Sequence, residues 1–249
     1  MVRGFYQLGS GIMTQNKVLG SIANNIANIQ TTGYKKQIVV SESFNNMMIA
    51  RMQNPTLGSK IYTPLGEKSL LKTVSQTASI HTQGTFKSTG RSLDAAIVGG
   101  GFFALQSDNG IVYTRKGDFN VDAEGYLTQS GYRVMGHNGP IRVGTDNVEF
   151  DANGNVYANG KSVGRLAIFD FADYNTLTPV VDGYYTAGGN PQLVNGQIRG
   201  GSLESSNVDM SEEMTNAIAA QRDLQTQTQI LKMYDTTLQK ATNEIGRIN

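Results

Sequence analysis

Only two side chains of this 249-residue chain, His81 and His137, have an unperturbed pKa suited to acid–base catalysis near neutral pH. A serine-type catalytic triad would need one of them beside an activated serine. Both histidines stand in segments that are typical of loops between strands, and nothing marks two carboxylates as a catalytic dyad. We therefore expect two surface histidines and no enzymatic activity.

Two further motifs resemble ligand sites but have the wrong spacing. Residues 151–155, Asp-Ala-Asn-Gly-Asn, resemble the first half of a calcium loop. Their glycine is fourth rather than sixth, and the twelfth position is Ser162 instead of a bidentate glutamate. Gly99-Gly100-Gly101 is not followed by the Lys-Ser/Thr of a phosphate-binding loop. We interpret the first as a turn and the second as close packing where a strand begins, and we expect neither a metal nor a cofactor.

Composition argues against several classes of partner. The net charge is +1, so no field favours nucleic acid or an anionic membrane, and no small-molecule substrate is indicated. The chain has no cysteine, which excludes disulfides and Cys-ligated zinc.

No segment approaches the roughly 20 apolar residues of a membrane-spanning helix, and the N-terminus lacks the pattern of a secretory signal. If the protein leaves the cytoplasm, we expect a route without a cleaved leader.

The two ends of the chain carry matching patterns. Mostly apolar side chains recur at alternating spacings of three and four residues, which is typical of a coiled-coil seam. An apolar stripe is more often the core face of one domain, but these two are narrow and terminal. We predict that they form two helices that pair with each other and with copies in neighbouring chains. The N-terminal set is Leu8, Ile12, Gln15, Leu19, Ile22, Ile26 and Ile29, and the C-terminal set is Ala217, Ala220, Leu224, Gln227, Leu231, Tyr234, Leu238, Ala241, Ile245 and Ile248.

Asparagines interrupt the N-terminal stripe. Asn24, Asn25 and Asn28 lower the intrinsic helicity of their segment. We interpret them as register amides that bond to neighbouring chains, and the alternative is that they face water. The helix is expected over about residues 2–29, with Gly33 able to adopt the left-handed conformation after its end.

The middle of the chain carries the signals of strands and turns. Ser107-Asp108-Asn109-Gly110 and Asp122-Ala123-Glu124-Gly125 predict two hairpins, and further Asn-Gly pairs stand at 138–139, 153–154, 159–160 and 195–196. Regularly spaced turns of this kind predict an antiparallel sandwich or barrel-like domain. Before them, residues 34–44 are expected to be extended and Phe44 to Gln53 helical.

The predicted fold class is therefore α+β, with long N- and C-terminal coiled-coil helices and a central antiparallel β-rich domain. We divide the chain into an N-terminal helix (1–33), an extended arm (34–80), the β-rich domain (81–204) and a C-terminal helix (205–249) that pairs with the first. Asn207 and Asp209 are N-cap candidates for the last helix, and Ser211, Glu212 and Glu213 fall in its first turn.

Three blocks of sequence carry a resemblance to a known family. The first block is Ala23–Asn28 with Thr32-Gly33-Tyr34-Lys35. The second block comprises Gln83-Gly84, Thr89-Gly90, Leu93–Ile97, Gly101-Phe102-Phe103, Tyr113-Thr114-Arg115, Gly117, Phe119, Asp122, Gly125 and Leu127. The third block is Leu203–Asp209 with Glu213-Met214 and Gln221-Arg222. Together they strongly resemble the bacterial flagellar rod and hook family, the axial proteins of the basal body. Departures are mild: Asp223-Leu224 stands where an aromatic-bearing pair is commoner, and Ala217-Ile218-Ala219 is smaller than usual.

The resemblance implies a structural subunit of the flagellar basal body in the cell envelope, exported unfolded by the flagellar type III apparatus. Its terminal helices would line the inner tube of a helical assembly with itself and neighbouring rod or hook proteins, and its β-rich domain would form the outer layer. Such an assembly transmits motor torque to the hook. The chain length and the short segment 163–201 favour the proximal rod, with a distal-rod or hook-type subunit as the alternative. A soluble β-rich carbohydrate-binding or carbohydrate-active protein is the alternative from another class.

Overall fold

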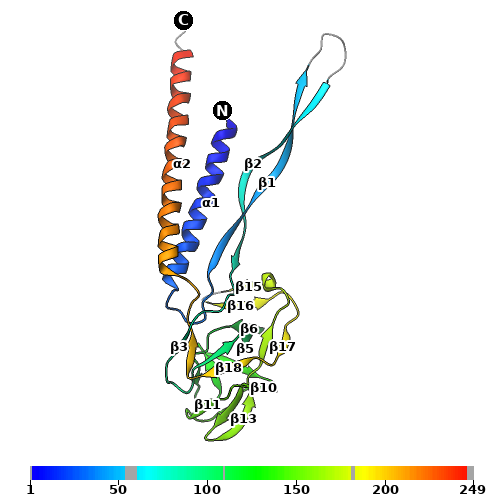
Figure 1. Cartoon of the computed structure of the whole chain (residues 1–249), viewed down its shortest axis with the longest axis vertical. Coiled ribbons are helices and arrows are strands. Elements are labelled where there is room, and N and C mark those ends of the chain that lie inside the picture. Colours follow the sequence, from blue (N-terminus) through cyan, green and yellow to red (C-terminus); the bar gives the residue numbers. More distant parts are fainter. Residues whose placement is uncertain (1, 54–60, 109, 181–182, 246–249) are drawn as a thin grey trace. The chain divides into compact units, whose positions relative to one another are not determined.

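The computed structural model describes residues 2–53, 61–108, 110–180 and 183–245 (Figure 1). It contains two long helices at the ends of the chain and a β-rich region between them, which confirms the α+β class. The elements, in chain order, are α1 (Val2–Ala27), β1 (Gln37–Gln53), β2 (Ile61–Ser79), β3 (Phe86–Ser88), β4 (Ala95–Val98), β5 (Phe102–Ser107), β6 (Gly110–Thr114), β7 (Asn120–Val121), β8 (Leu127–Gln129), β9 (Tyr132–Gly136), β10 (Gly139–Pro140), β11 (Val148–Phe150), β12 (Asn155–Ala158), β13 (Lys161–Arg165), β14 (Ile168–Asp170), the short 3-10 helix η1 (Tyr174–Thr176), β15 (Leu177–Pro179), β16 (Tyr184–Ala187), β17 (Gln192–Val194), β18 (Gln197–Gly200), β19 (Ser202–Glu204) and α2 (Met210–Ile245).

The chain forms two compact units. The first unit comprises Met1–Asn24, Gln37–Ala78 and Ser211–Asn249, and the second comprises Asn25–Lys36 and Ser79–Met210. The first unit therefore holds most of both helices and the pair β1–β2, and the second holds the rest of the strands. None of the helices in the described ranges has the length and hydropathy of a membrane-spanning segment.

In the first unit, α1 and α2 lie side by side and run in opposite directions (Figure 1). Gly4 lies against the Tyr234 ring and Gly11 against the Gln227 side chain, and Gln15 Nε2 donates to Ala220 O at 3.3 Å. As the position in α1 rises, the position of its partner in α2 falls.

The terminal helices follow the sequence-based predictions except at the end of α1. Helix α1 ends at Ala27, so Ile29 lies in the turn that follows and not on the helical stripe. Gly33 adopts the expected left-handed conformation (φ +66°). Helix α2 carries Glu212 and Glu213 in its first turn, where carboxylates favour the positive end of the helix dipole.

The first unit also corrects the prediction of a helix from Phe44 to Gln53. These residues belong to β1, which pairs with β2 in a two-stranded sheet. The run Ile38-Val39-Val40 at the start of β1 favours a strand because branched side chains suit a pleated surface. Pairing with the next strand, β2, overrides the weak local preference for helix in the rest of β1. The Ser21 hydroxyl donates to Gln37 O at 2.9 Å, which joins α1 to the start of this strand.

The second unit is built around β5. Its sheet has the order β15-β16-β6-β5-β9-β8-β7, with β14 also pairing with β5 and each described register antiparallel. Successive side chains of a strand point to opposite faces, and both faces of β5 are buried. Phe103 and Leu105 enter the larger core, while Phe102 and Ala104 enter a smaller one that also contains Tyr113, Phe171, Leu177 and Tyr185.

The turns between strands are the part of the β-rich unit that the sequence predicts best. Ser107 pairs with Gly110 to close the first predicted hairpin, although Asn109 itself lies outside the described residues. Asn159 and Gly160 have φ of +50° and +75° between β12 and β13, as a tight hairpin turn requires. The second predicted hairpin joins β7 to β8. The pair at 195–196 forms no hairpin, because β17 pairs with β14 while β18 pairs with β4.

Candidate assembly surface and buried ion cluster

The predicted seam positions face the partner helix within one chain but are mostly only half-buried. On α1, Ile22 is buried, while Leu8, Ile12, Leu19 and Ile26 are intermediate. On α2, Ala220 is buried, Leu238 is exposed, and the intermediate positions are Ala217, Leu224, Leu231, Tyr234 and Ala241. The side chain of Ile245, the last residue of α2, and all of Ile248 lie outside what the structure describes. One helix pair therefore leaves much of the predicted stripe accessible.

A second set of apolar side chains lies on the faces of the helices that point away from the stripes. Met13 is 73% exposed and Tyr6 64%, and a spacing of seven residues places them on one face of α1. On α2, Met233 is 66% exposed and Ile218 55%. Gly9 and Gly20 of α1 have open space where a Cβ would stand. Exposed apolar side chains gathered along two helices are typical of a protein–protein contact surface.

The three predicted register amides have different environments. Asn25 is buried within its own chain, where its Oδ1 accepts a hydrogen bond from the Tyr34 hydroxyl at 3.2 Å. Asn28 Oδ1 accepts from the Thr31 hydroxyl at 3.1 Å in the turn after α1. Asn24 is exposed. The described contacts of Asn25 and Asn28 are thus intrachain, and Asn24 has the exposure that a contact with another chain requires.

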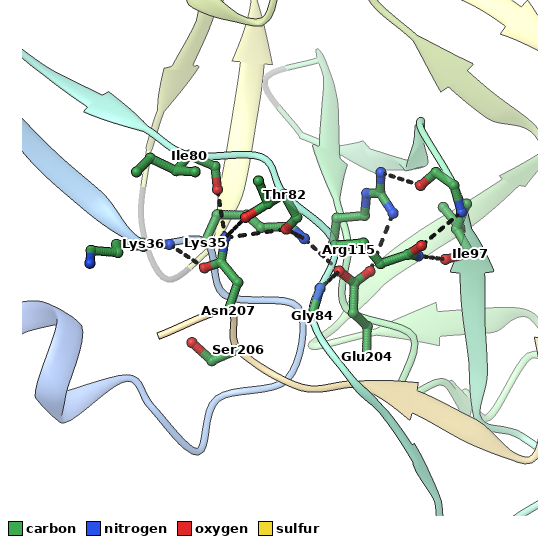
Figure 2. Close-up of polar contacts among 12 residues, drawn as sticks. Lys35, Lys36, Ile80, Thr82, Gly84, Ile97, Arg115, Glu204, Ser206 and Asn207 are labelled. Atoms are coloured by element: carbon green, nitrogen blue, oxygen red, sulfur yellow. Dashed lines mark hydrogen bonds and ion pairs between the residues drawn. The ribbon is translucent and has the colours of Figure 1, made fainter. Parts of the chain in front are cut away.

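The second unit contains a buried ion cluster that the sequence did not predict (Figure 2). Lys35 Nζ lies 2.5 Å from Glu204 Oε1, and Arg115 Nη1 lies 3.2 Å from Glu204 Oε2. The side chains of Lys35 and Glu204 are fully buried, and that of Arg115 is 3% exposed. We call Lys35, Arg115 and Glu204 the ion cluster. Two cations share one carboxylate, so the cluster carries a net positive charge inside the protein.

Backbone groups add further hydrogen bonds to these charges, although the buried Arg115 Nε has no partner among the described residues. Lys35 Nζ also donates to Thr82 O, and Arg115 Nη2 donates to Gly99 O, both at 2.8 Å. Glu204 Oε1 accepts from Gly84 N at 2.9 Å. The Arg115 guanidinium lies 5.2 Å from the centre of the Phe102 ring, within the range of a cation–π contact. Gly99 has a φ of +91°, a conformation that favours glycine, and its carbonyl accepts from Arg115, so the Gly99–Gly101 segment does more than pack closely.

An amide clamp adjoins the ion cluster. Asn207 Oδ1 accepts from Lys36 N at 2.7 Å, and Asn207 Nδ2 donates to Ile80 O at 2.8 Å and to Thr82 O at 3.2 Å. Ile80 N in turn donates to Lys36 O at 2.8 Å. One side chain thus joins the segments that precede β1, follow β2 and precede α2 (Figure 2). Asn207 was expected to cap α2, and its described bonds instead fasten three segments together.

His81 lies in a loop, as predicted, but it is half-buried and not a fully exposed surface histidine. Its ring packs against those of Phe102, Tyr174 and Tyr185 at centroid distances of 5.5, 5.0 and 5.4 Å. Burial, with the positive charges of Lys35 and Arg115, lowers the pKa of His81 to about 4. Burial likewise lowers the pKa of Lys35, and Glu204 opposes that shift. His137 is exposed in the turn between β9 and β10, as predicted.

The close approach of two backbones at Gly84 gives a first prediction. A Cβ on residue 84 would lie 2.0 Å from Ser205 O, far inside contact distance. Gly84→Ala must therefore separate these segments and break the bond from Gly84 N to Glu204, and we expect it to lower the free energy of unfolding by about 1–3 kcal/mol. Gly20→Ala is the matched control, because its Cβ meets nothing within 4 Å. Denaturant titration followed by circular dichroism measures both. Equal stability of Gly84→Ala and wild type would contradict this reading of the contact.

The remaining catalytic and ligand candidates have structural explanations. The Asp151 carboxylate accepts from Asn153 N and from Asn155 N and Nδ2, as in a hydrogen-bonded turn, which confirms the turn interpretation. Burial raises the pKa of Asp151, but these hydrogen bonds and the charge of Arg165 together outweigh it, so the pKa lies below its usual value. Residues 160–164 read Gly-Lys-Ser-Val-Gly, with the spacing of a nucleophile elbow. Ser162 lies within β13 after a hairpin turn, whereas an elbow needs a sharp turn from a strand into a helix.

Comparison with known proteins connects these features to a family. Residues 5–35 match the family described as "Flagella basal body rod protein", residues 96–158 match "Flagellar hook protein FlgE/F/G D1 domain", and residues 199–244 match "Flagellar basal body rod FlgEFG protein C-terminal". Among similar proteins, the flagellar basal-body rod protein FlgG of Bacillus subtilis is 33% identical over 98% of this chain and 99% of its own length. FlgF of Caulobacter vibrioides is 34% identical over 95% of each chain, and FlhO of B. subtilis, a flagellar hook-basal body complex protein, is 27% identical over the full length of both.

Each of the three matched segments contributes one charged residue to the ion cluster. Lys35 is the last residue of the first match, Arg115 lies in the second and Glu204 in the third. The three sequence blocks that carry the family resemblance therefore meet at one buried carboxylate in the second unit. A signal was present in the sequence, because each block holds a charged residue beside apolar or glycine residues, but no pattern indicated which charges meet.

Proposed function

Because the chain belongs to the flagellar basal-body rod protein family, we propose that it is a structural subunit of the rod that assembles through its terminal helices with copies of itself and with neighbouring rod or hook proteins. Its place is the flagellar basal body, which it reaches through the flagellar export apparatus. Its role is mechanical, the transmission of torque from motor to hook, and not enzymatic. The assigned parts are axial segments 1–33 and 205–249, an arm at 34–80 and an outer β-rich domain at 81–204.

The observation that supports assembly is the apolar surface that remains on the helix pair. The stripes of α1 and α2 are half-buried, and Tyr6, Met13, Ile218 and Met233 are more than half exposed. Burying one such side chain contributes roughly 1.5–3 kcal/mol of free energy. An isolated pair of helices leaves these side chains exposed and does not gain this free energy. Copies of the same helices supply the complementary apolar surface. Burial of this surface along the whole length of the rod would make the rod stiff.

Within this family we favour a proximal-rod position, with the distal rod or the hook as alternatives. The support is the chain length of 249 residues and the short segment between residues 163 and 201, because a hook subunit usually carries a larger outer domain. Proposed register contacts between copies use Asn24 and the stripe residues. The stripe set for this purpose is Leu8, Ile12, Leu19, Ile22, Ile26, Ala217, Leu224, Leu231, Leu238 and Ile245.

Thiol labelling tests the assembly proposal. Because the chain has no cysteine, Met13→Cys or Met233→Cys introduces one unique thiol. In a dilute monomer both thiols should react freely with a water-soluble maleimide, and in isolated basal bodies they should react at least about tenfold more slowly because an interface core excludes water. Glu124→Cys is a matched control, since Glu124 is 64% exposed in a turn of the second unit, and should react equally in both states. Undiminished labelling of Met13→Cys and Met233→Cys in basal bodies would refute contact through these helix faces.

A further inference from the structure

Of the four places where the chain enters or leaves the second unit, three lie within three residues of a residue of the amide clamp, and the fourth is bonded to Tyr34, the neighbour of Lys35. These places are before Asn25, after Lys36, before Ser79 and after Met210. Tyr34 bonds Asn25, Lys36 bonds both Ile80 and Asn207, and Asn207 bonds Ile80. Opening this one region of the second unit would therefore release the ends of all four connections together.

His81 occupies a sensitive position in this region. The carbonyls of its two sequence neighbours, Ile80 and Thr82, are acceptors for Asn207 and Lys35. Its Nδ1 is buried and, within the described part of the chain, has no hydrogen-bond partner. A shift of the backbone at His81 that frees its ring would also displace the two neighbouring carbonyls that accept from Asn207 and Lys35.

The charges around His81 make its protonation unfavourable in the closed form. Lys35, before β1, and Arg115, after β6, both act on the ring as cations. The one carboxylate of the cluster, Glu204 of β19, is already shared by these two. The phenols of Tyr174 in η1 and Tyr185 in β16 pack on the ring, and Asp170 of β14 accepts the Tyr174 hydroxyl at 2.7 Å.

We propose that His81 is an acid-operated latch, whose protonation opens the ion cluster and amide clamp while the β core of the second unit stays folded. A third cation is repelled by Lys35 and Arg115, and Glu204 is already paired with both of them, so the protonated ring leaves its aromatic pocket for water. Ile80 and Thr82 move with it, and Asn207 and Lys35 lose their acceptors. This latch lies within the second unit and does not require assembly with other subunits.

The direction and size of the pH effect follow from linkage. The folded pKa of His81 is about 4, against 6.5 for the exposed ring. Between these pH values the His81 ring is protonated in the open form and neutral in the closed form. The equilibrium therefore shifts toward the open form as pH falls. The equilibrium constant for opening should rise by up to about tenfold per pH unit, and by about 80-fold between pH 6.5 and 4.

Hydrogen exchange on the full-length monomer, corrected for intrinsic exchange at each pH, measures this opening. The reporter amides are Gly33, Ile80 and Ser205, which donate to Glu204 O, Lys36 O and Thr85 O at 2.8 Å. Leu127, which donates to Ile141 O at 2.9 Å, is the reference in the β core. We expect reporter protection to fall by up to about tenfold per pH unit below pH 6.5 and reference protection to change far less.

His81→Phe keeps an aromatic ring without a titrating group and should make reporter protection flat between pH 6.5 and 4. His137→Gln, a change at the exposed histidine, should keep the wild-type profile. An acid response that persists in His81→Phe, or a reference amide that opens in parallel, would overturn the latch. The histidine ring signal of the wild-type protein gives a second measurement without substitution, since titration of His81 at pH 6.5 with full reporter protection would also refute it.

Discussion

Glu204→Gln should lower the free energy of unfolding of the second unit by about 3–5 kcal/mol, because it leaves two buried cations without their shared anion. The amide of glutamine retains an acceptor for Gly84 N or Arg115 but offers no charge to either cation. Because the chain has no tryptophan, near-ultraviolet circular dichroism reports its tyrosines, most of which lie in the second unit. Denaturant titration with this signal measures the change.

Two further variants separate the charge effect from general disruption. Glu212→Gln is the matched control, since Glu212 is exposed in the first turn of α2 and should change stability by at most about 1 kcal/mol. Lys35→Met combined with Glu204→Gln removes one cation along with the anion. The double variant should be less destabilised than the sum of the two single variants, since the partners share one cluster. A Glu204→Gln protein within about 1 kcal/mol of wild type would show that the cluster contributes little.

Local chemistry explains which parts of the fold the sequence predicts. A turn such as Asn159-Gly160 is specified by two neighbouring residues, because few residues other than glycine and asparagine tolerate positive φ. The helical stripes repeat over many residues, so the existence of α1 and α2 was predictable while the end of α1 was not. The helix predicted over Phe44–Gln53 is wrong because pairing with β2 decides the conformation of β1.

The ion cluster shows what sequence patterns leave out. Lys35 and Glu204 are separated by 169 positions, and neither stands in a spacing that indicates a partner. Their blocks were recognisable through the family resemblance, yet the resemblance did not say that the blocks meet. The same holds for His81, whose position in a loop suggested exposure although aromatic rings from β5, η1 and β16 enclose it. Contacts between distant segments of the chain set both environments.

Leu231→Asp should abolish motility while the second unit stays folded. Leu231 is half-buried on α2, between Gln227 and Tyr234, the residues that contact Gly11 and Gly4 of α1. The substitution removes apolar contact and places a carboxylate in a half-buried stripe, at a cost of several kcal/mol in each copy. A helical assembly repeats that cost at each subunit, so even a modest defect in one contact prevents growth of the rod. Swimming assays and recovery of basal bodies measure the loss.

Two comparisons make this last result specific to the seam. Leu231→Met keeps volume and apolar character, which usually costs less than about 1.5 kcal/mol, and should leave bacteria motile. The soluble Leu231→Asp subunit should keep the wild-type tyrosine signal, because Leu231 belongs to the first unit and the tyrosine-rich cores belong to the second. Folded but unassembled protein is the outcome that places the defect in contacts between copies. A motile Leu231→Asp strain would mean that this stripe does not hold the rod together, and assembly would then have to depend on the exposed faces that carry Met13 and Met233.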